Sequence, residues 1–279
     1  MMEHVVVRRV AVVGAASQIG QALLPRLAAK RIPVLRIGRE DAGLEAESAD
    51  AVISLAPLPA IAAVLKKAEV LGAKRVIAFG STGRFSKRGS SSAIERDFVA
   101  QQEHAESLFS SQSNAAGIAW TLFRPTMIYG ADADQNVTFI KAMVARFGFF
   151  PVPWGAKGLR QPVHVGDLAD ACVSALECGR TFGRAYDLGG GEVLSFPEMV
   201  RRISLAAGKR PVLLPVPMAL YYLVVAAAKR YPATAFVREE MVERMFQDLT
   251  ADNLPAFDAF GYSPRRFSPE QSVAIRGGQ

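Results

Sequence analysis

A strand, a glycine turn and a helix follow one another near the start of the chain, and this order constrains the fold most. Val10 to Val13 form an apolar run that ends at Gly14, and the apolar positions 19, 23, 24 and 27 then recur at helical spacing. Gly14 allows a tight turn, and Gly20 allows the helix to pack closely on the strand. The pattern predicts the start of a βαβ unit.

The same alternation continues along the first half of the chain. Further strands are predicted at 34–37, 51–55, 75–79 and 118–123, with helices at 61–68 and 97–109. Parallel strands need crossover connections, and the helices in these connections cover both faces of the sheet. We therefore expect an α/β fold with a doubly wound parallel sheet.

The second half of the chain has a different pattern. Beyond Gly130 the alternation loosens, although 163–165 and 185–188 still indicate strands, and the chain is mainly helical after Gly191. A length of 279 residues agrees with two folding units. We expect residues 1–130 plus 160–190 to form the doubly wound domain. Residues 131–159 plus 191–279 are expected to form a smaller, mostly helical domain.

Composition excludes several classes of protein. Lys and Arg number 33 against 26 Asp and Glu, a net charge of +7 that suits anionic partners, but these cations are dispersed and no nucleic acid is expected. The two cysteines give no disulfide framework, and no Cys/His group has zinc spacing, so a reducing cytoplasm and no metal are expected. The uncharged stretch 211–228 is broken by prolines and too short to cross a bilayer.

The glycine turn also predicts a ligand. The amino terminus of the helix after the turn offers unpaired N–H groups that suit the pyrophosphate of a dinucleotide. Ser17 replaces the middle glycine of the usual pattern, which narrows the approach to the phosphates. The alternative interpretation is that the turn has only a structural role and binds no cofactor. The expected cofactor-binding residues are Gly14, Ser17, Gln18, Ile19 and Gly20.

The end of the second strand bears on the choice of cofactor. No carboxylate occupies the strand end, where Gly38 stands, and Arg39 beside it can pair with a 2′-phosphate. This favours NADP(H) over NAD(H), although Glu40 can reach the ribose of NAD. In the alternative interpretation, Arg36 and Arg39 are solvated charges on the protein surface and bind no cofactor.

Several motifs in order resemble the short-chain dehydrogenase/reductase superfamily, in its extended, NAD-dependent epimerase/dehydratase-like branch. They are residues 50–56, 75–82, 124–130, 161–169 and 261–265. The resemblance implies a Rossmann-like NAD(P)-binding domain with a smaller substrate domain, and a nucleotide-sugar-like or other anionic ligand. It adds Leu55, Ala56, Ser81 and Pro125 as cofactor contacts, and Thr82, Tyr129 and Arg160 as substrate contacts.

The family's catalytic pattern is incomplete here. In relatives a Ser or Thr works with a Tyr-x-x-x-Lys pair, in which the tyrosine transfers a proton and the lysine lowers its pKa. The resemblance places Phe98 and Gln102 at these two positions and leaves Thr82 as the remnant of the triad. The segment between Arg39 and Asp50 is also short, so the usual third strand and its helix are expected to be absent.

Two functions therefore remain open. The first is an atypical NAD(P)-binding member that acts on or binds a nucleotide-sugar-like ligand. The second is a non-catalytic, nucleotide-bound scaffold or sensor, similar to the accessory subunit of respiratory complex I that shares this fold. In the second case residues 217–230 are a membrane-surface or partner-binding helix, whereas a buried helix of the small domain is the favoured interpretation. The substrate, turnover and oligomeric state stay open.

Overall fold

The structure is a computed structural model, and it describes residues 6–38, 46–130, 134–210, 212–228 and 239–269. The chain divides into two compact units. The larger unit comprises Met1–Thr126, Val163–Gly190 and Ala251–Arg265, and the smaller unit comprises Met127–Pro162, Gly191–Thr250 and Arg266–Gln279. Arg39 and Glu40, which bear on the choice between NADP and NAD, lie outside the described residues.

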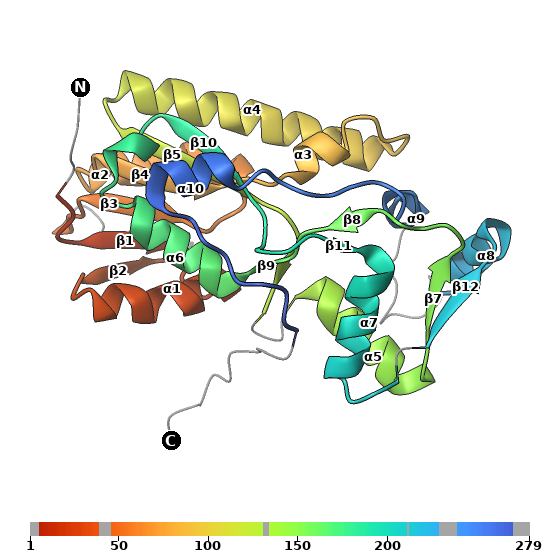
Figure 1. Cartoon of the computed structure of the whole chain (residues 1–279). Coiled ribbons are helices and arrows are strands. Elements are labelled where there is room, and N and C mark those ends of the chain that lie inside the picture. Colours follow the sequence, from red (N-terminus) through yellow and green to blue (C-terminus); the bar gives the residue numbers. More distant parts are fainter. Residues whose placement is uncertain (1–5, 39–45, 131–133, 211, 229–238, 270–279) are drawn as a thin grey trace. The chain divides into compact units, whose positions relative to one another are not determined.

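The larger unit is built on a six-stranded sheet in the order β10-β5-β4-β3-β1-β2, and every pair of neighbouring strands is parallel (Figure 1). The strands are β1 (Val10–Val13), β2 (Val34–Ile37), β3 (Ala51–Ser54), β4 (Arg75–Phe79), β5 (Ala119–Pro125) and β10 (Arg184–Leu188). All residues of β1, β3 and β4 are buried, as expected for strands covered on both faces. The predicted Rossmann-like α/β fold is confirmed.

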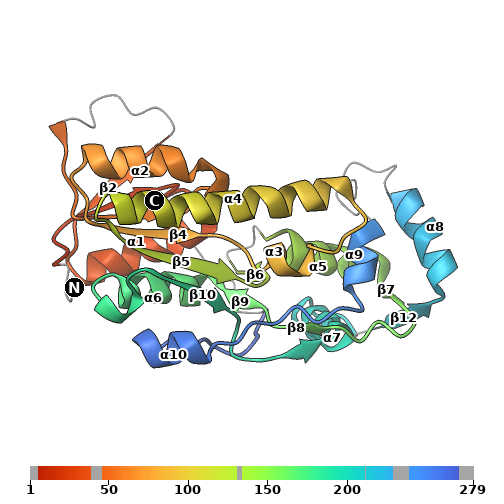
Figure 2. The ribbon, with the colours of Figure 1, turned by 90° about the horizontal axis from the view of Figure 1, so that it is seen from above.

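Helices cover both faces of this sheet. α1 (Gln18–Ala29) and α6 (Val165–Ala175) pack together on one face, and α2 (Ile61–Val70) and α4 (Ala93–Ala115) on the other (Figures 1 and 2). The apolar positions of α2 and α4 form one buried cluster with the sheet residues beneath them. Shorter helices are η2 (Leu58–Ala60), α3 (Gly83–Ser86), η3 (Gly179–Thr181) and α10 (Leu254–Phe260).

The connection after β2 is short, as expected. The chain passes from β2 to β3, which pairs with the opposite side of β1, so β2 is the last strand of the described sheet. Between β2 and β3 the described residues contain no further strand and no α-helix. The usual third strand and its helix are therefore absent from the described part of the chain.

Residues 251–265 belong to the larger unit, whereas the sequence had suggested the smaller domain. The reason is the aromatic side of α10: the Phe260 ring lies 5.7 Å from that of Phe123 and 5.4 Å from that of Tyr186. The Tyr262 hydroxyl also donates to the Gly189 carbonyl at 2.9 Å. These contacts bury the apolar face of a short helix against β5 and β10.

The smaller unit combines helices with short strands. β7 (Phe150–Pro153) pairs with β12 (Leu213–Val216), and β8 (Leu159–Arg160) pairs with β11 (Leu194–Ser195). The main helices are α5 (Gln135–Phe147) and α7 (Phe196–Ala206), which pack together over a buried apolar cluster. Also present are β6 (Ile128–Tyr129), α8 (Met218–Ala228) and α9 (Glu239–Arg244), while β9 (Val163–His164) belongs to the larger unit.

Among its described side chains, helix α8 buries Tyr221 and exposes Leu220 and Leu223. Tyr221 packs with Val216 and Val242, whereas Leu220 and Leu223 are exposed. No described helix is long and apolar enough to cross a membrane. Membrane-surface contact through residues 217–230 stays a prediction, because the side chains from 224 to 230 are outside the described set.

Candidate functional site

The glycine turn between β1 and α1 is tightly packed. Gly14 has a φ of +77°, where a side chain would be strained, and a Cβ there would lie 3.3 Å from the carbonyl carbon of Leu55. A Cβ on Gly20 would lie 2.3 Å from the Ala15 carbonyl oxygen, a clash with backbone that cannot move aside cheaply. Both glycines are therefore required by the backbone, which leaves the turn pressed closely against the start of α1.

Ser17 is the N-cap of α1. Its hydroxyl accepts a hydrogen bond from the Gly20 amide at 3.2 Å, so the serine satisfies one of the helix's unpaired N–H groups. The first backbone bond of the helix runs from Gln21 to Ser17 at 2.9 Å. The amides of Gln18 and Ile19 precede it, and with the helix dipole they favour an anion. The replacement of glycine by serine thus supports the helix start.

The carboxyl ends of β3, β4 and β5 bring the other expected cofactor contacts to one edge of the sheet, where ligands of such folds bind. The Leu55 amide donates to the Val13 carbonyl at 2.9 Å, which places Leu55 and Ala56 beside the glycine turn. The Thr82 hydroxyl donates to the Pro125 carbonyl at 3.1 Å. Ser81 accepts from the Gly83 amide at 3.0 Å.

Phe98 and Gln102 lie on the face of α4 that turns towards the end of β4. A Cβ on Gly83 would lie 3.4 Å from Phe98 Cε1, and a Cβ on Gly80 would lie 3.5 Å from Gln102 Oε1. The Lys87 ammonium lies 4.4 Å from the centre of the Phe98 ring. Gln102 is only 6% exposed, and its Oε1 has no hydrogen-bond partner among the described residues. Neither side chain can carry a proton in the way a tyrosine–lysine pair does.

An ionic network fixes this part of α4, and the sequence reasoning missed it. The buried Glu106 binds the guanidinium groups of both Arg84 and Arg124, and Arg124 continues to Asp187 at 3.1 Å. The Phe85 ring lies 5.1 Å from the Arg84 guanidinium and 5.5 Å from that of Arg124. The network joins α3 and α4 to the ends of β5 and β10. The sequence feature that points to this network is a carboxylate, Glu106, one helical turn after Gln102.

Two expected substrate contacts lie inside the smaller unit. Arg160 is 5% exposed and donates to the carbonyls of Leu159, Gln247 and Arg244 at 2.7, 2.8 and 2.6 Å. Burial lowers its pKa to about 10, so the guanidinium is still protonated at neutral pH. The Tyr129 hydroxyl accepts from the Ser268 amide at 3.3 Å. Both side chains have a structural role here, and their substrate contacts stay predictions.

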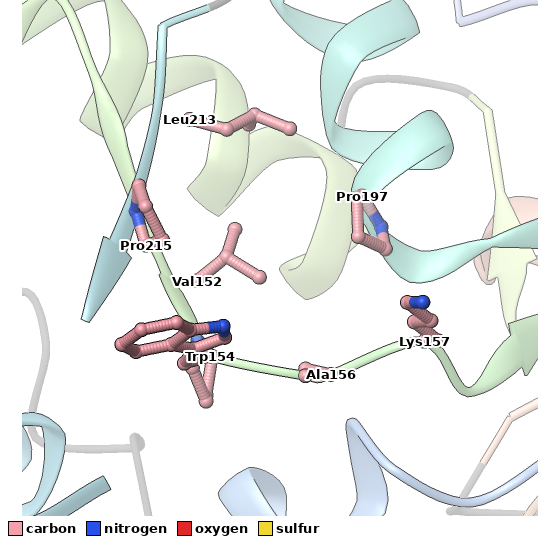
Figure 3. A pocket seen from close by; sticks show the side chains of 9 residues that line it. Val152, Trp154, Ala156, Lys157, Pro197, Leu213 and Pro215 are labelled. Atoms are coloured by element: carbon pink, nitrogen blue, oxygen red, sulfur yellow. The ribbon is translucent and has the colours of Figure 1, made fainter. Parts of the chain in front are cut away.

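The smaller unit also contains a pocket of about 270 Å³ (Figure 3). Its lining residues are Val152, Pro153, Trp154, Gly155, Ala156, Lys157, Pro197, Leu213 and Pro215. The Trp154 side chain is 75% exposed. An apolar pocket with one indole ring and one ammonium group suits a ring-shaped ligand that carries a negative charge.

Solved structures define the class of fold. The chain resembles a UDP-glucose 4-epimerase of Thermotoga maritima solved with UDP-glucose, with a TM-score of 0.69 and 16% identity over 94% of this chain and 95% of that one. It also resembles RMD of Pseudomonas aeruginosa complexed with NADPH, with a TM-score of 0.67 and 16% identity over 95% and 96% of the two chains. At these identities the likeness shows the fold.

Sequence comparisons identify a family that part of the chain matches. Residues 58–189 match the model of the NAD dependent epimerase/dehydratase family. A UDP-glucose 4-epimerase of Vibrio cholerae is 24% identical over 174 residues, 62% of this chain and 50% of that protein. The mitochondrial NADH dehydrogenase [ubiquinone] 1 alpha subcomplex subunit 9 of Arabidopsis thaliana is 33% identical over 102 residues, 36% of this chain and 25% of that protein.

The matched region thus belongs to the NAD-dependent epimerase/dehydratase family, and the resemblance inferred from the sequence is confirmed. The chain spans about half the length of the first of these curated relatives and a quarter of the second.

Proposed function

We propose that this chain binds a nicotinamide dinucleotide through the larger unit, NADP(H) in preference to NAD(H). The observation that carries the proposal is the turn from Gly14 to Gly20, in which two glycines that the backbone requires precede a capped helix start. Arg39 enters this proposal from the sequence alone. The remaining cofactor contacts are proposed to be Ser17, Gln18, Ile19, Leu55, Ala56, Ser81 and Pro125.

The second ligand in this proposal is a nucleotide sugar or a related anion. The UDP-glucose 4-epimerases among the similar proteins support this class, and so does the net charge of +7. The pocket beside Trp154 offers an aromatic face and the Lys157 ammonium group. Thr82 and Tyr129 are proposed as further contacts. Arg160 is a weaker candidate than the sequence suggested, since three backbone carbonyls already accept its hydrogen bonds.

The chemistry of the site is limited by α4. A bound nicotinamide ring can accept or return a hydride, but proton transfer must come from the protein. Thr82 supplies a hydroxyl, which donates to the Pro125 carbonyl. Phe98 and Gln102 contribute shape and packing instead of an acid and a cation. We therefore propose that the chain holds its nucleotide without the tyrosine-dependent step.

Dinucleotide binding is tested by thermal unfolding of the purified chain with NADPH, NADH or neither. A ligand present at 100 times its dissociation constant adds about 2.7 kcal/mol to the free energy of unfolding, so the melting temperature should rise by several degrees. We expect the rise with NADPH to exceed that with NADH at equal concentration. An unchanged melting temperature with both nucleotides, at concentrations up to millimolar, would refute the proposal.

A gain of activity tests the role of α4. We expect the double variant Phe98→Tyr with Gln102→Lys to turn over NAD(P)H with a panel of nucleotide sugars about 100-fold faster than the wild type, the size of an ordinary general acid–base contribution. The ammonium group of the new lysine would lie near the Glu106 carboxylate. The Glu106 and Gln102 side chains both face Gly80, since a Cβ built there would lie 3.4 Å from Glu106 Oε1 and 3.5 Å from Gln102 Oε1. Nicotinamide absorbance measures the rate.

The matched control for this experiment is Phe98→Tyr alone, which restores the hydroxyl without the cation and should gain little. If the wild type turns over as fast as the double variant, another acid or base must act, and the proposed loss of the tyrosine-dependent step is wrong.

The second candidate function is a non-catalytic scaffold or sensor. It is favoured by the 33% identity with the Arabidopsis thaliana NADH dehydrogenase subunit, the highest identity among the relatives described above. Nucleotide that co-purifies with the chain, together with no turnover by the wild type, would support the scaffold. Oxidation of NADPH by the wild type in the presence of any nucleotide sugar or simple carbonyl would exclude it.

A further inference from the structure

The pocket beside Trp154 is lined by apolar side chains and by two hydrogen-bond donors. Apart from a glycine and an alanine, its lining residues are Val152, Pro153, Trp154, Lys157, Pro197, Leu213 and Pro215 (Figure 3). The donors are the indole N–H of Trp154 and the ammonium group of Lys157, and none of these side chains offers an acceptor. The volume of about 270 Å³ lies just below the range of sites for drug-sized ligands, so the pocket fits a small molecule or one part of a larger one.

The backbone around Trp154 is held in place, whereas the residue itself is exposed. The Trp154 amide donates to the Val216 carbonyl at 2.9 Å, which extends the pairing of β7 with β12 by one residue. Gly155 has a φ of +81°, and the Ala156 amide closes this turn on the Pro153 carbonyl at 3.0 Å. Trp154 is nevertheless 75% exposed. A large apolar ring held beside an apolar pocket favours a ligand that covers both.

Lys157 supplies an unpaired positive charge at the same pocket. It is exposed, and within the described residues its ammonium group has no hydrogen-bond or ion-pair partner. The smaller unit as a whole is also basic, since it holds 14 of the 33 Lys and Arg of the chain but 9 of the 26 Asp and Glu, which is +5 of the net +7. An anionic ligand is therefore favoured over a neutral or a cationic one.

We propose that this pocket binds an amphipathic acid, a molecule with an apolar ring or chain and one carboxylate. The inference rests on the anionic ligand proposed above and narrows it from nucleotide sugars to related anions with an apolar body. A carboxylate only accepts hydrogen bonds, so it matches the donors of the pocket, and Lys157 is the partner of its charge. The hydroxyls of a sugar also donate, and each one buried here without an acceptor would weaken binding about tenfold.

The test is titration of the full chain with hexanoate, octanoate, octanol, octylamine and UDP-glucose. A Trp120→Phe background leaves Trp154 as the single tryptophan, and its fluorescence reports binding. Octanoate should bind at least about tenfold more tightly than octanol or octylamine, the gain expected from one charge-assisted hydrogen bond. It should also bind about tenfold more tightly than hexanoate, because each buried methylene contributes about fourfold. UDP-glucose should bind more weakly than octanoate.

Two variants test the residues of the pocket. Lys157→Ala should weaken octanoate about tenfold and leave octanol within about twofold, whereas Trp154→Ala should weaken both about tenfold. Calorimetry measures the second variant, which lacks the reporter ring. Both side chains are exposed, so the melting temperature should stay unchanged. The matched control is Lys209→Ala, an exposed lysine of the same unit outside the pocket lining, which should alter neither affinity.

The outcomes separate this inference from the proposed function. If UDP-glucose binds and octanoate does not, only the narrower ligand class is overturned. If octanol binds as tightly as octanoate, or Lys157→Ala weakens both alike, the pairing of Lys157 with a carboxylate is overturned. If neither octanoate nor UDP-glucose binds, this inference and the proposed second ligand both fail, while the response to NADPH decides the dinucleotide part of the proposed function separately.

Discussion

Replacing Ser17 by aspartate should abolish dinucleotide binding while the chain stays folded. Aspartate is as good an N-cap as serine, so its carboxylate can still accept the Gly20 amide that the Ser17 hydroxyl accepts at 3.2 Å. The same carboxylate places a negative charge where the pyrophosphate is proposed to lie. Two like charges about 4 Å apart repel by about 4 kcal/mol at a surface-like dielectric constant, so a loss of affinity of at least about 100-fold is expected.

The control for this prediction is Ser17→Asn. Asparagine has nearly the shape of aspartate and also caps helices well, but it carries no charge. We expect Ser17→Asn to retain NADPH binding within about tenfold and Ser17→Asp to lose it, with equal melting temperatures in the absence of nucleotide. Titration calorimetry and thermal unfolding measure the two quantities. If Ser17→Asp still bound NADPH, the proposal that the pyrophosphate lies at the amino terminus of α1 would be wrong.

The sequence predicts those features that depend on neighbours along the chain. The apolar run before Gly14 and the helical spacing after it identify β1 and α1, and Ser195 with Glu198 indicates the capped start of α7, where the Ser195 hydroxyl accepts from the Glu198 amide at 3.3 Å. The short segment before Asp50 likewise predicts that no further strand lies between β2 and β3, and the described residues of this segment contain none. These signals are local because turns, caps and amphipathic periods are formed by residues a few positions apart.

Features formed by distant residues were harder to predict. The place of α10 depends on where the Phe260 ring finds an apolar surface, and that surface is made by β5 and β10. The partners of Glu106 come from α3 and β5, and the interaction of Lys67 with Gly38 requires the register of α2 on the sheet. Arg160 was expected to bind substrate because spacing alone does not show whether backbone carbonyls already surround a guanidinium group.

Arg75 places a positive charge in the interior of the larger unit. It lies at the start of β4, is fully buried, and lies 4.8 Å from the centre of the Phe182 ring. Its guanidinium donates to the hydroxyls of Thr121 and Thr181 at 2.8 and 3.1 Å. It also donates to the carbonyls of Ala175 and Leu176 at 2.9 and 3.2 Å, at the carboxyl end of α6, where the helix dipole favours a cation. Burial lowers the pKa of Arg75 to about 9, which leaves it charged at neutral pH.

Arg75→Met should therefore lower the free energy of unfolding of the larger unit by about 3–5 kcal/mol. Methionine fills part of the space, but it leaves several buried oxygens without a donor, and each unsatisfied group costs about 1–3 kcal/mol. The exposed arginine of β10 offers the matched control, since Arg184→Met should change stability by no more than about 0.5 kcal/mol. Urea unfolding followed by Trp120 fluorescence, in a Trp154→Phe background, reports on the larger unit alone because Trp154 belongs to the smaller one. A loss below about 1 kcal/mol would mean that water or rearranged hydroxyls replace the guanidinium, and that Arg75 does not hold α6 to the sheet.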